Sequence, residues 1–96
     1  MYKIQSLSRR IDKQFDKVMS RFSDEEVEKI KEELQREPKG NTASHRKIKK
    51  VAPTIWQYDL PEGYRLEYTV VDDLETIFLL FIGNHDDAAA YLRGKK

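Results

Sequence analysis

The stretch of sequence that decides the fold is Gly63-Tyr64-Arg65-Leu66-Glu67-Tyr68-Thr69-Val70. Apolar and polar side chains alternate along it, which predicts a β-strand with one face in the core and Arg65 on the other face. Residues 77–82 are apolar at every position, as expected for a central strand covered on both faces. The acidic turn at residues 72–75 joins these two strands as an antiparallel hairpin, and residues 55–60 supply a third antiparallel strand.

The residues upstream predict an edge strand followed by a helical hairpin. Residues 2–7 alternate weakly and form a short first strand. In residues 11–22 the apolar side chains recur at the spacing of a 3.6-residue helix. Ser23 and Glu26 have the spacing of a capping box, so a second helix begins there, and it ends before Pro38.

The predicted fold class is therefore α+β. It consists of an N-terminal strand, a helical hairpin and a three-stranded antiparallel sheet, closed by a short helix or an irregular segment at residues 86–92. We expect residues 1–96 to form a single domain, because a chain of this length builds one modest core. The helices would cover one face of the sheet and leave the other face partly open.

The composition excludes several classes of protein. No apolar run approaches the roughly 20 residues of a membrane-spanning helix, and nothing at the N-terminus has the pattern of a signal peptide. The chain has no cysteine, which rules out disulfides and thiolate metal sites. We therefore expect a cytoplasmic protein without a membrane partner. The net charge of +1 hides a segregation, since residues 39–50 carry basic residues and no acid.

The order of elements, the motif at residues 63–70, and Gly83-Asn84-His85 leading to Tyr91 together resemble the RelE branch of the RelE/ParE toxin superfamily over nearly the whole chain. Members of this branch are ribosome-dependent endoribonucleases that cut messenger RNA in the decoding site, and each is held inactive by a cognate antitoxin. The resemblance thus implies a RelE-like fold, with an antitoxin and ribosome-bound messenger RNA as partners. It also implies catalysis without a metal or another cofactor.

The resemblance implies catalytic roles for Arg65, His85 and Tyr91. The reaction of the family is a transesterification, in which a ribose 2′-oxygen attacks the adjacent phosphate. Arg65 aligns with the arginine that stabilises the phosphorane, and a guanidinium grips two phosphate oxygens at once. Tyr91 aligns with the C-terminal catalytic tyrosine, which positions the substrate. His85 stands where the closest relatives carry an arginine, and its imidazole can protonate the leaving 5′-oxygen.

The RNA-binding residues are expected in two places. The candidate contacts to the RNA backbone are four basic residues in a loop: Arg46, Lys47, Lys49 and Lys50. In the strand before the Gly-Tyr-Arg motif the best-studied branch carries two lysines, and this chain has Trp56 and Tyr58 instead. Aromatic rings at these positions can stack on unpaired bases, or they can pack in the core. The general base stays unassigned, because the lysines that would supply it are missing.

Each of these residues also has a purely structural interpretation. Arg65 can pair with Glu67 or Glu75, His85 can pair with a neighbouring carboxylate, and Tyr91 can anchor the C-terminus on the sheet. On that interpretation the chain is a noncatalytic RelE-like module that binds a protein partner or a nucleic acid. Inhibition of DNA gyrase, as in the ParE branch, is a third alternative. The pairs of aspartates lie next to turns, where they are commonplace, so we expect no metal site.

Overall fold

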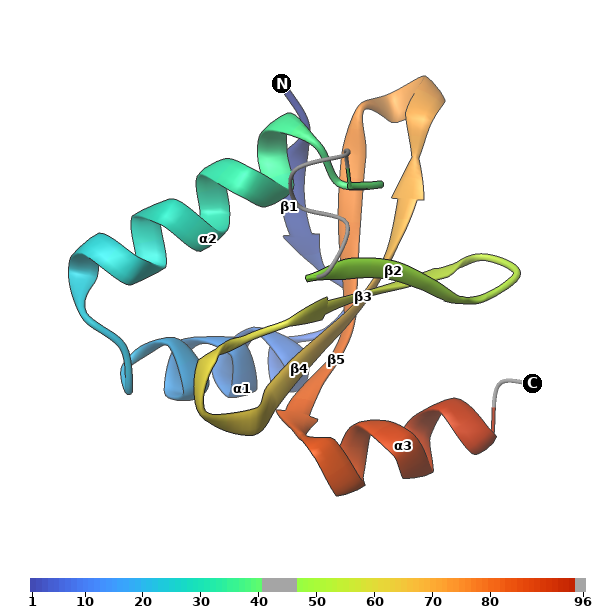
Figure 1. The fold of residues 1–96 in the computed structure, drawn as a ribbon. Coiled ribbons are helices and arrows are strands. Elements are labelled where there is room, and N and C mark those ends of the chain that lie inside the picture. The colour runs from blue at the N-terminus through green and yellow to red at the C-terminus, as the bar shows by residue number, and fades with distance from the viewer. Residues whose placement is uncertain (41–46, 95–96) are drawn as a thin grey trace.

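The computed structural model describes residues 1–40 and 47–94, and within them the strands form one five-stranded sheet (Figure 1). The elements follow the chain as β1 (Lys3–Ser6), α1 (Arg9–Met19), α2 (Asp24–Arg36), β2 (Ile48–Ala52), β3 (Ile55–Asp59), β4 (Tyr64–Val71), β5 (Thr76–Asn84) and α3 (His85–Arg93). The strand order across the sheet is β1-β5-β4-β3-β2. β1 runs parallel to β5, and the other neighbouring strands are antiparallel. The predicted α+β class is confirmed.

Strand β2 corrects the prediction of a three-stranded antiparallel sheet. The basic run that we placed in a loop pairs with β3, from Ile48 opposite Tyr58 to Ala52 opposite Ile55. In β2 only Ile48 is fully buried, and the two lysines that follow it are exposed. The run therefore lacks the apolar alternation by which a strand is recognised in a sequence, and backbone pairing with β3 makes it a strand.

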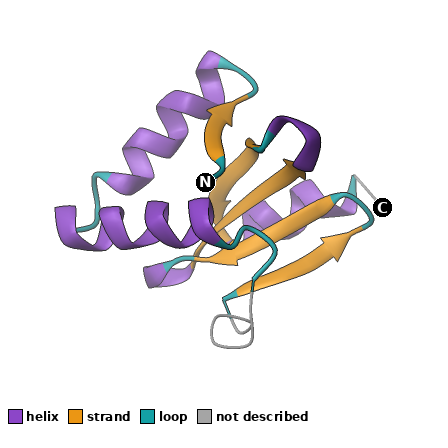
Figure 2. Ribbon diagram, turned by 90° about the horizontal axis from the view of Figure 1, so that it is seen from above, coloured by secondary structure: helices purple, strands orange, loops and turns teal. Residues whose placement is uncertain are grey.

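Helices α1 and α2 cover one face of the sheet (Figure 2). Their apolar stripes form the core with the inward side chains of β4 and β5, and the central members are Phe15, Val18, Phe22, Ile30, Leu34, Leu66, Tyr68, Ile77, Leu79 and Ile82. The predicted capping box is present at the start of α2. The Ser23 hydroxyl accepts from the Glu26 N–H at 3.2 Å, and the Glu26 carboxylate accepts from the Ser23 N–H at 3.3 Å. None of the described helices is long and apolar enough to cross a membrane.

Helix α3 lies on the other face of the sheet, against β4 and β5 (Figure 2). The Asn84 side chain caps it by accepting from the Asp87 N–H at 2.9 Å, and Ala88 is the buried residue of the helix. Of the two forms left open for residues 86–92, the helix is the correct one. The face that we expected to be partly open is therefore closed above β4 and β5.

A bulge in β5 determines which side chains point toward α3. Glu67 pairs with Phe81 and Tyr68 pairs with Leu79, so Leu80 is an extra residue with no partner of its own in β4. Because of this extra residue, Phe81 faces away from the helical hairpin, whereas Leu79 stays in the core.

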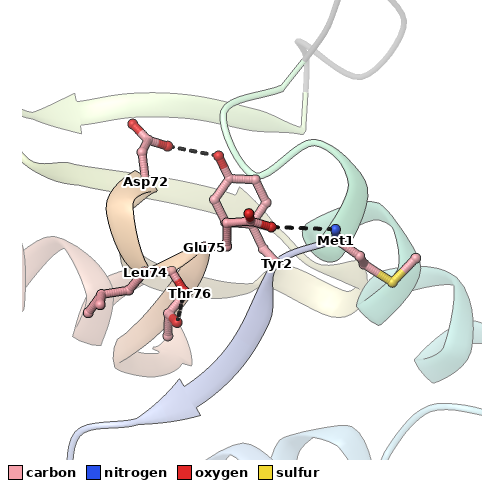
Figure 3. A network of polar contacts seen from close by, with 6 residues as sticks. All are labelled: Met1, Tyr2, Asp72, Leu74, Glu75 and Thr76. Atoms are coloured by element: carbon pink, nitrogen blue, oxygen red, sulfur yellow. Dashed lines mark hydrogen bonds and ion pairs between the residues drawn. The ribbon is translucent and has the colours of Figure 1, made fainter.

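Polar contacts fix the tip of the β4–β5 hairpin to the N-terminus (Figure 3). The Tyr2 hydroxyl donates to Asp72 Oδ1 at 2.8 Å, and the N-terminal amine lies 3.8 Å from Glu75 Oε2. Lys39, just after α2, donates to the other oxygen of Asp72 at 2.7 Å. Residues far apart in the chain thus hold the turn between the two central strands.

The buried hydroxyl of Tyr68 should contribute more to stability than the exposed hydroxyl of Tyr2. Tyr68 is 0% exposed, and its hydroxyl donates to the Pro38 carbonyl at 2.6 Å. Tyr68→Phe leaves that carbonyl without this donor and should lower the free energy of unfolding by about 1–3 kcal/mol. Tyr2→Phe, the matched control, should cost less than about 1 kcal/mol because water replaces the lost partner. Urea denaturation measures both, and equal losses would contradict the structure.

Candidate active site

The candidate active site lies on the sheet face opposite the α1–α2 hairpin. Residues opposite one another on neighbouring strands point to the same side of a sheet. Two cross-strand rows meet on β4: Asp59, Arg65 and Gly83 form one, and Lys49, Gln57, Glu67 and Phe81 form the other. We call the surface formed by these seven residues the Arg65 face.

Arg65 is held at this face by a carboxylate of β3. Its Nε lies 3.5 Å from Asp59 Oδ1, and its side chain is 27% exposed. The same oxygen of Asp59 accepts from Gln57 Nε2 at 3.2 Å. The expectation that a structural partner would be Glu67 or Glu75 is therefore wrong, because the cross-strand register puts Asp59 directly opposite Arg65. The guanidinium is partly exposed and only loosely paired, which suits a group that must bind a phosphate.

Tyr91 of α3 lies over the Arg65 face. Its ring stacks on that of Phe81, with centroids 5.0 Å apart and planes 12° apart. Burial raises the pKa of the Tyr91 hydroxyl above its ordinary value, and the nearby Glu67 carboxyl raises it further. A Cβ at Gly83 would stand only 3.0 Å from the Phe81 ring, so the absence of a side chain at this position leaves room for the ring. Tyr91 thus anchors α3 and also shares a surface with Arg65.

His85 is the first residue of α3 and lies close in the chain to the partner of Arg65. Arg65 is opposite Gly83 in β5, two residues before His85. The His85 side chain is 60% exposed, and its Nδ1 is 3.5 Å from Asp86 Oδ1. The contact with a neighbouring carboxylate that the structural interpretation expected is present, and it leaves most of the imidazole exposed. The imidazole is open to solvent and to a ligand at this end of the sheet.

The predicted basic contacts divide between the two faces of the sheet. Lys49 is opposite Gln57 and belongs to the Arg65 face. Lys50 is opposite Trp56, and its ammonium lies 5.9 Å from the centre of that indole, on the other face. Lys47 is exposed in the turn just before β2. Arg46 lies outside the described residues.

The two aromatic residues predicted to stack on RNA bases point away from Arg65. Trp56 is opposite Tyr68 and is half-buried against the core. Tyr58 is 2% exposed, and its hydroxyl donates to the Glu33 carboxylate of α2. A ring with no exposed surface cannot stack on a base, so the prediction for Tyr58 is wrong and its alternative, core packing, is correct. Burial raises the pKa of the Tyr58 hydroxyl, and the hydrogen bond to Glu33 adds to this shift.

Glu67 is the residue of this site that sequence reasoning missed. Alternation placed it on the open face, yet it is 0% exposed, and neither carboxylate oxygen has a hydrogen-bond partner among the described residues. Burial raises its pKa to about 8. The negative charge of Asp59 acts in the same direction, whereas Arg65 and Lys49 lower the pKa. A signal was present in the sequence, because the continuous apolar run of β5 indicated that its neighbour on β4 would be covered on both faces.

The described residues contain no group of three or more histidines, aspartates and glutamates placed to hold a metal ion. Among them the candidate groups for acid, base or phosphate-binding chemistry at this face are Arg65, His85, Tyr91 and the carboxyls of Asp59 and Glu67.

Comparison with known proteins finds similarity at the level of structure. No family model and no curated protein matches the chain. The isolated RelE toxin of Escherichia coli matches with a TM-score of 0.62 at 21% identity, over 97% of this chain and 98% of RelE. A conserved hypothetical protein of Helicobacter pylori matches with a TM-score of 0.61 at 19% identity, over 92% of this chain and 99% of its own. The chain has the RelE toxin fold.

A third match is a variant of E. coli RelE in complex with a peptide of the antitoxin RelBc. Its TM-score is 0.59 at 21% identity, over 99% of this chain and 95% of the toxin. The RelE-like fold expected from the sequence is confirmed by these matches, which extend over nearly the whole length of each chain. The Arg65 face therefore belongs to a RelE-like sheet, and in this chain it contains a buried carboxyl.

Replacing Glu67 by glutamine should remove a pH dependence of folding stability. Folded Glu67 keeps its proton up to about pH 8, whereas in the unfolded chain its pKa is 4.5. Its stabilising contribution is complete below the unfolded pKa and falls by up to about 1.4 kcal/mol per pH unit as the pH rises through this window. Urea denaturation across the window should show the slope in the wild type and in Glu28→Gln, a control on the exposed side of α2. Equal slopes for Glu67→Gln and the wild type would refute the assignment.

Proposed function

We propose that this protein is the toxin of a type II toxin–antitoxin pair and acts as a ribosome-dependent endoribonuclease on messenger RNA. The proposal rests mainly on one observation. Arg65 lies on the outer face of β4, loosely paired and partly exposed, in a fold that matches RelE over 97% of this chain. The position suits a guanidinium that binds the scissile phosphate, since the strand holds the residue in place and the side chain is partly exposed.

The proposed reaction is a 2′-oxygen attack on the neighbouring phosphate. The attacking hydroxyl loses its proton, the oxygen forms a bond to phosphorus, and the 5′-oxygen leaves and takes up a proton. Arg65 stabilises the extra negative charge of the phosphorane, and His85 gives the proton to the leaving oxygen. Tyr91 positions the substrate from α3. No residue is assigned to remove the proton from the attacking hydroxyl.

The RNA backbone would be held by cations beside this face. Lys49 is an exposed member of the Arg65 face, and Lys50 with Trp56 extends the surface around the free edge of the sheet at β2. Lys47, exposed just before β2, lines a cavity with Lys29 of α2. Arg46 is proposed with them on the sequence alone. Each phosphate that these side chains neutralise makes binding more dependent on salt, with a slope of about −0.7 per contact for a single strand.

We infer that the partner that keeps this protein inactive is an antitoxin. The support comes from E. coli RelE, which has been solved with a peptide of the antitoxin RelBc. An antitoxin of this kind would be encoded next to the gene of its toxin, so the neighbouring reading frame is the simplest place to look for it.

A noncatalytic RelE-like module is the second candidate function. It is favoured by the ion pair between Arg65 and Asp59, which satisfies part of the guanidinium without a ligand. The net charge of +1 also gives only weak long-range attraction to RNA. On this alternative the Arg65 face binds a protein or a nucleic acid and no bond is cleaved.

Inducing the gene in a bacterial host separates the two functions. The toxin should arrest growth and cut messenger RNA on ribosomes, and Arg65→Ala should lower the cleavage rate by about 10²–10³-fold because it removes a charge from the transition state. His85→Ala should also reduce cleavage. Arg36→Ala, on the exposed side of α2 and paired with Glu32, is the matched control and should leave activity unchanged.

Undiminished growth with intact transcripts would rule out the nuclease and leave the binding module. Growth arrest with DNA damage and intact transcripts would indicate gyrase as the target. The melting temperature of each purified variant must match that of the wild type, so that a loss of activity is not a loss of fold.

A further inference from the structure

The buried carboxyl of Glu67 has no hydrogen-bond partner within residues 1–40 and 47–94, although suitable partners lie near it. Gln57 is directly opposite Glu67, but its amide nitrogen donates to Asp59. Arg65 is on the same side of the same strand, but its Nε is also directed at Asp59. Two donors that could satisfy Glu67 are thus used by the neighbouring carboxylate. A buried polar group in this condition carries a cost of about 1–3 kcal/mol, so it calls for an explanation.

An arginine at position 65 can reach either carboxylate. Residues two apart on a strand are separated by about 6.6 Å and point to the same side. The long side chain of Arg65 covers this distance along β4, and it covers the shorter distance across to Asp59 as observed. The two acids therefore compete for one guanidinium, with Asp59 at the surface and Glu67 inside.

We propose that Glu67 is a positioning residue for Arg65, and that its proton decides where the guanidinium lies. With the carboxyl protonated, Arg65 stays at the surface beside Asp59 and is available to an RNA phosphate. With the carboxyl ionised, the buried negative charge of Glu67 attracts the guanidinium inward. The positive charge of Arg65 is then neutralised by Glu67 and is no longer available to a phosphate. The proposal rests on the proposed function for its RNA ligand, but the movement of Arg65 can be tested without RNA.

The charged and titratable groups around Glu67 support the first arrangement near neutral pH. Arg65 faces it from β4, Asp59 from β3, Lys49 from β2 and Tyr91 from α3, while β5 contributes the apolar ring of Phe81. Burial keeps the pKa of Glu67 at about 8, so the carboxyl is mostly neutral at pH 7. The cations Arg65 and Lys49 then face a neutral Glu67, with the anion Asp59 beside them and Asp87 of α3 next to Gly83. Ionisation of Glu67 makes the site more negative by one charge, which disfavours a phosphate.

The first test follows Arg65 by nuclear magnetic resonance across the titration of Glu67, without RNA. The nitrogen shift of Arg65 Nε should move with a midpoint near pH 8 in the wild type. It should not move over that range in Glu67→Gln, which keeps the shape of the side chain and cannot ionise. Glu67→Met, apolar and of similar length, is the second variant in case glutamine is poorly tolerated. An Arg65 shift that titrates equally in these variants, or that stays constant in the wild type, would overturn the proposal.

The second test measures affinity for a short single-stranded RNA that is methylated on its 2′-oxygens and so cannot be cleaved. At constant salt, wild-type binding should weaken by about tenfold or more as the pH rises through the pKa of Glu67, the loss expected for one charged hydrogen bond. Glu67→Gln should bind with the same affinity throughout, and Glu28→Gln should follow the wild type.

The two tests distinguish the failure of this proposal from the failure of the proposed function. An Arg65 resonance that titrates with Glu67, in a protein that neither binds this RNA nor cuts messenger RNA on ribosomes, would reject the RNA function and uphold the positioning role. RNA binding that weakens equally in the wild type and in Glu67→Gln would overturn the positioning role and leave the RNA function standing. A purely structural Glu67 would leave the Arg65 shift and the RNA affinity of the wild type without a transition at its pKa, and this result would overturn the positioning role.

Discussion

The pairing of β4 with both of its neighbours is the constraint on which the rest of the structure depends. β4 lies between β3 and β5, and its residues alternate between the core and the Arg65 face. Leu66 and Tyr68 pack under the helices, and Arg65 and Glu67 point to the opposite side. A slip of one residue in either pairing would exchange these sets and place the arginine in the core. The same backbone hydrogen bonds thus determine which side chains pack in the core and which point toward the Arg65 face.

The sequence predicted the parts of the fold in which a local pattern is strong. β4 alternates cleanly, β5 is a continuous apolar run, and the capping box marks the start of α2, so each could be placed without knowing its neighbours. β2 could not be placed in this way. It has a single fully buried side chain, Ile48, and it is a strand because β3 offers it an edge. The information that creates it lies in another segment of the chain.

The position of Arg65 could be predicted from its own strand, whereas the side on which Tyr58 lies depends on how neighbouring strands pair. Arg65 lies on the face that alternation gave it, whereas Tyr58 lies in the core because the register puts it opposite Leu66. A five-residue strand of mixed character does not reveal which of its sides is covered. The burial of Glu67 depends on α3, which follows β5 and packs across it through Tyr91 and Phe81. The continuous apolar run of β5 indicated that this side of the sheet is covered, but no local pattern shows that α3 supplies the cover.

The anchoring of the chain on either side of residues 41–46 has a consequence for how this protein can vary. Before them, the Pro38 carbonyl accepts from the Tyr68 hydroxyl, and after them the Lys47 carbonyl accepts from the Asp59 N–H at 2.7 Å. Both ends of the connection are therefore fastened to the central strands. Doubling the length of a connection between fixed ends costs only about 0.6 kcal/mol. Descendants of this chain can thus change the length or the charge of the connection, and with them the molecules that the connection contacts. The strand register that positions Arg65 stays the same.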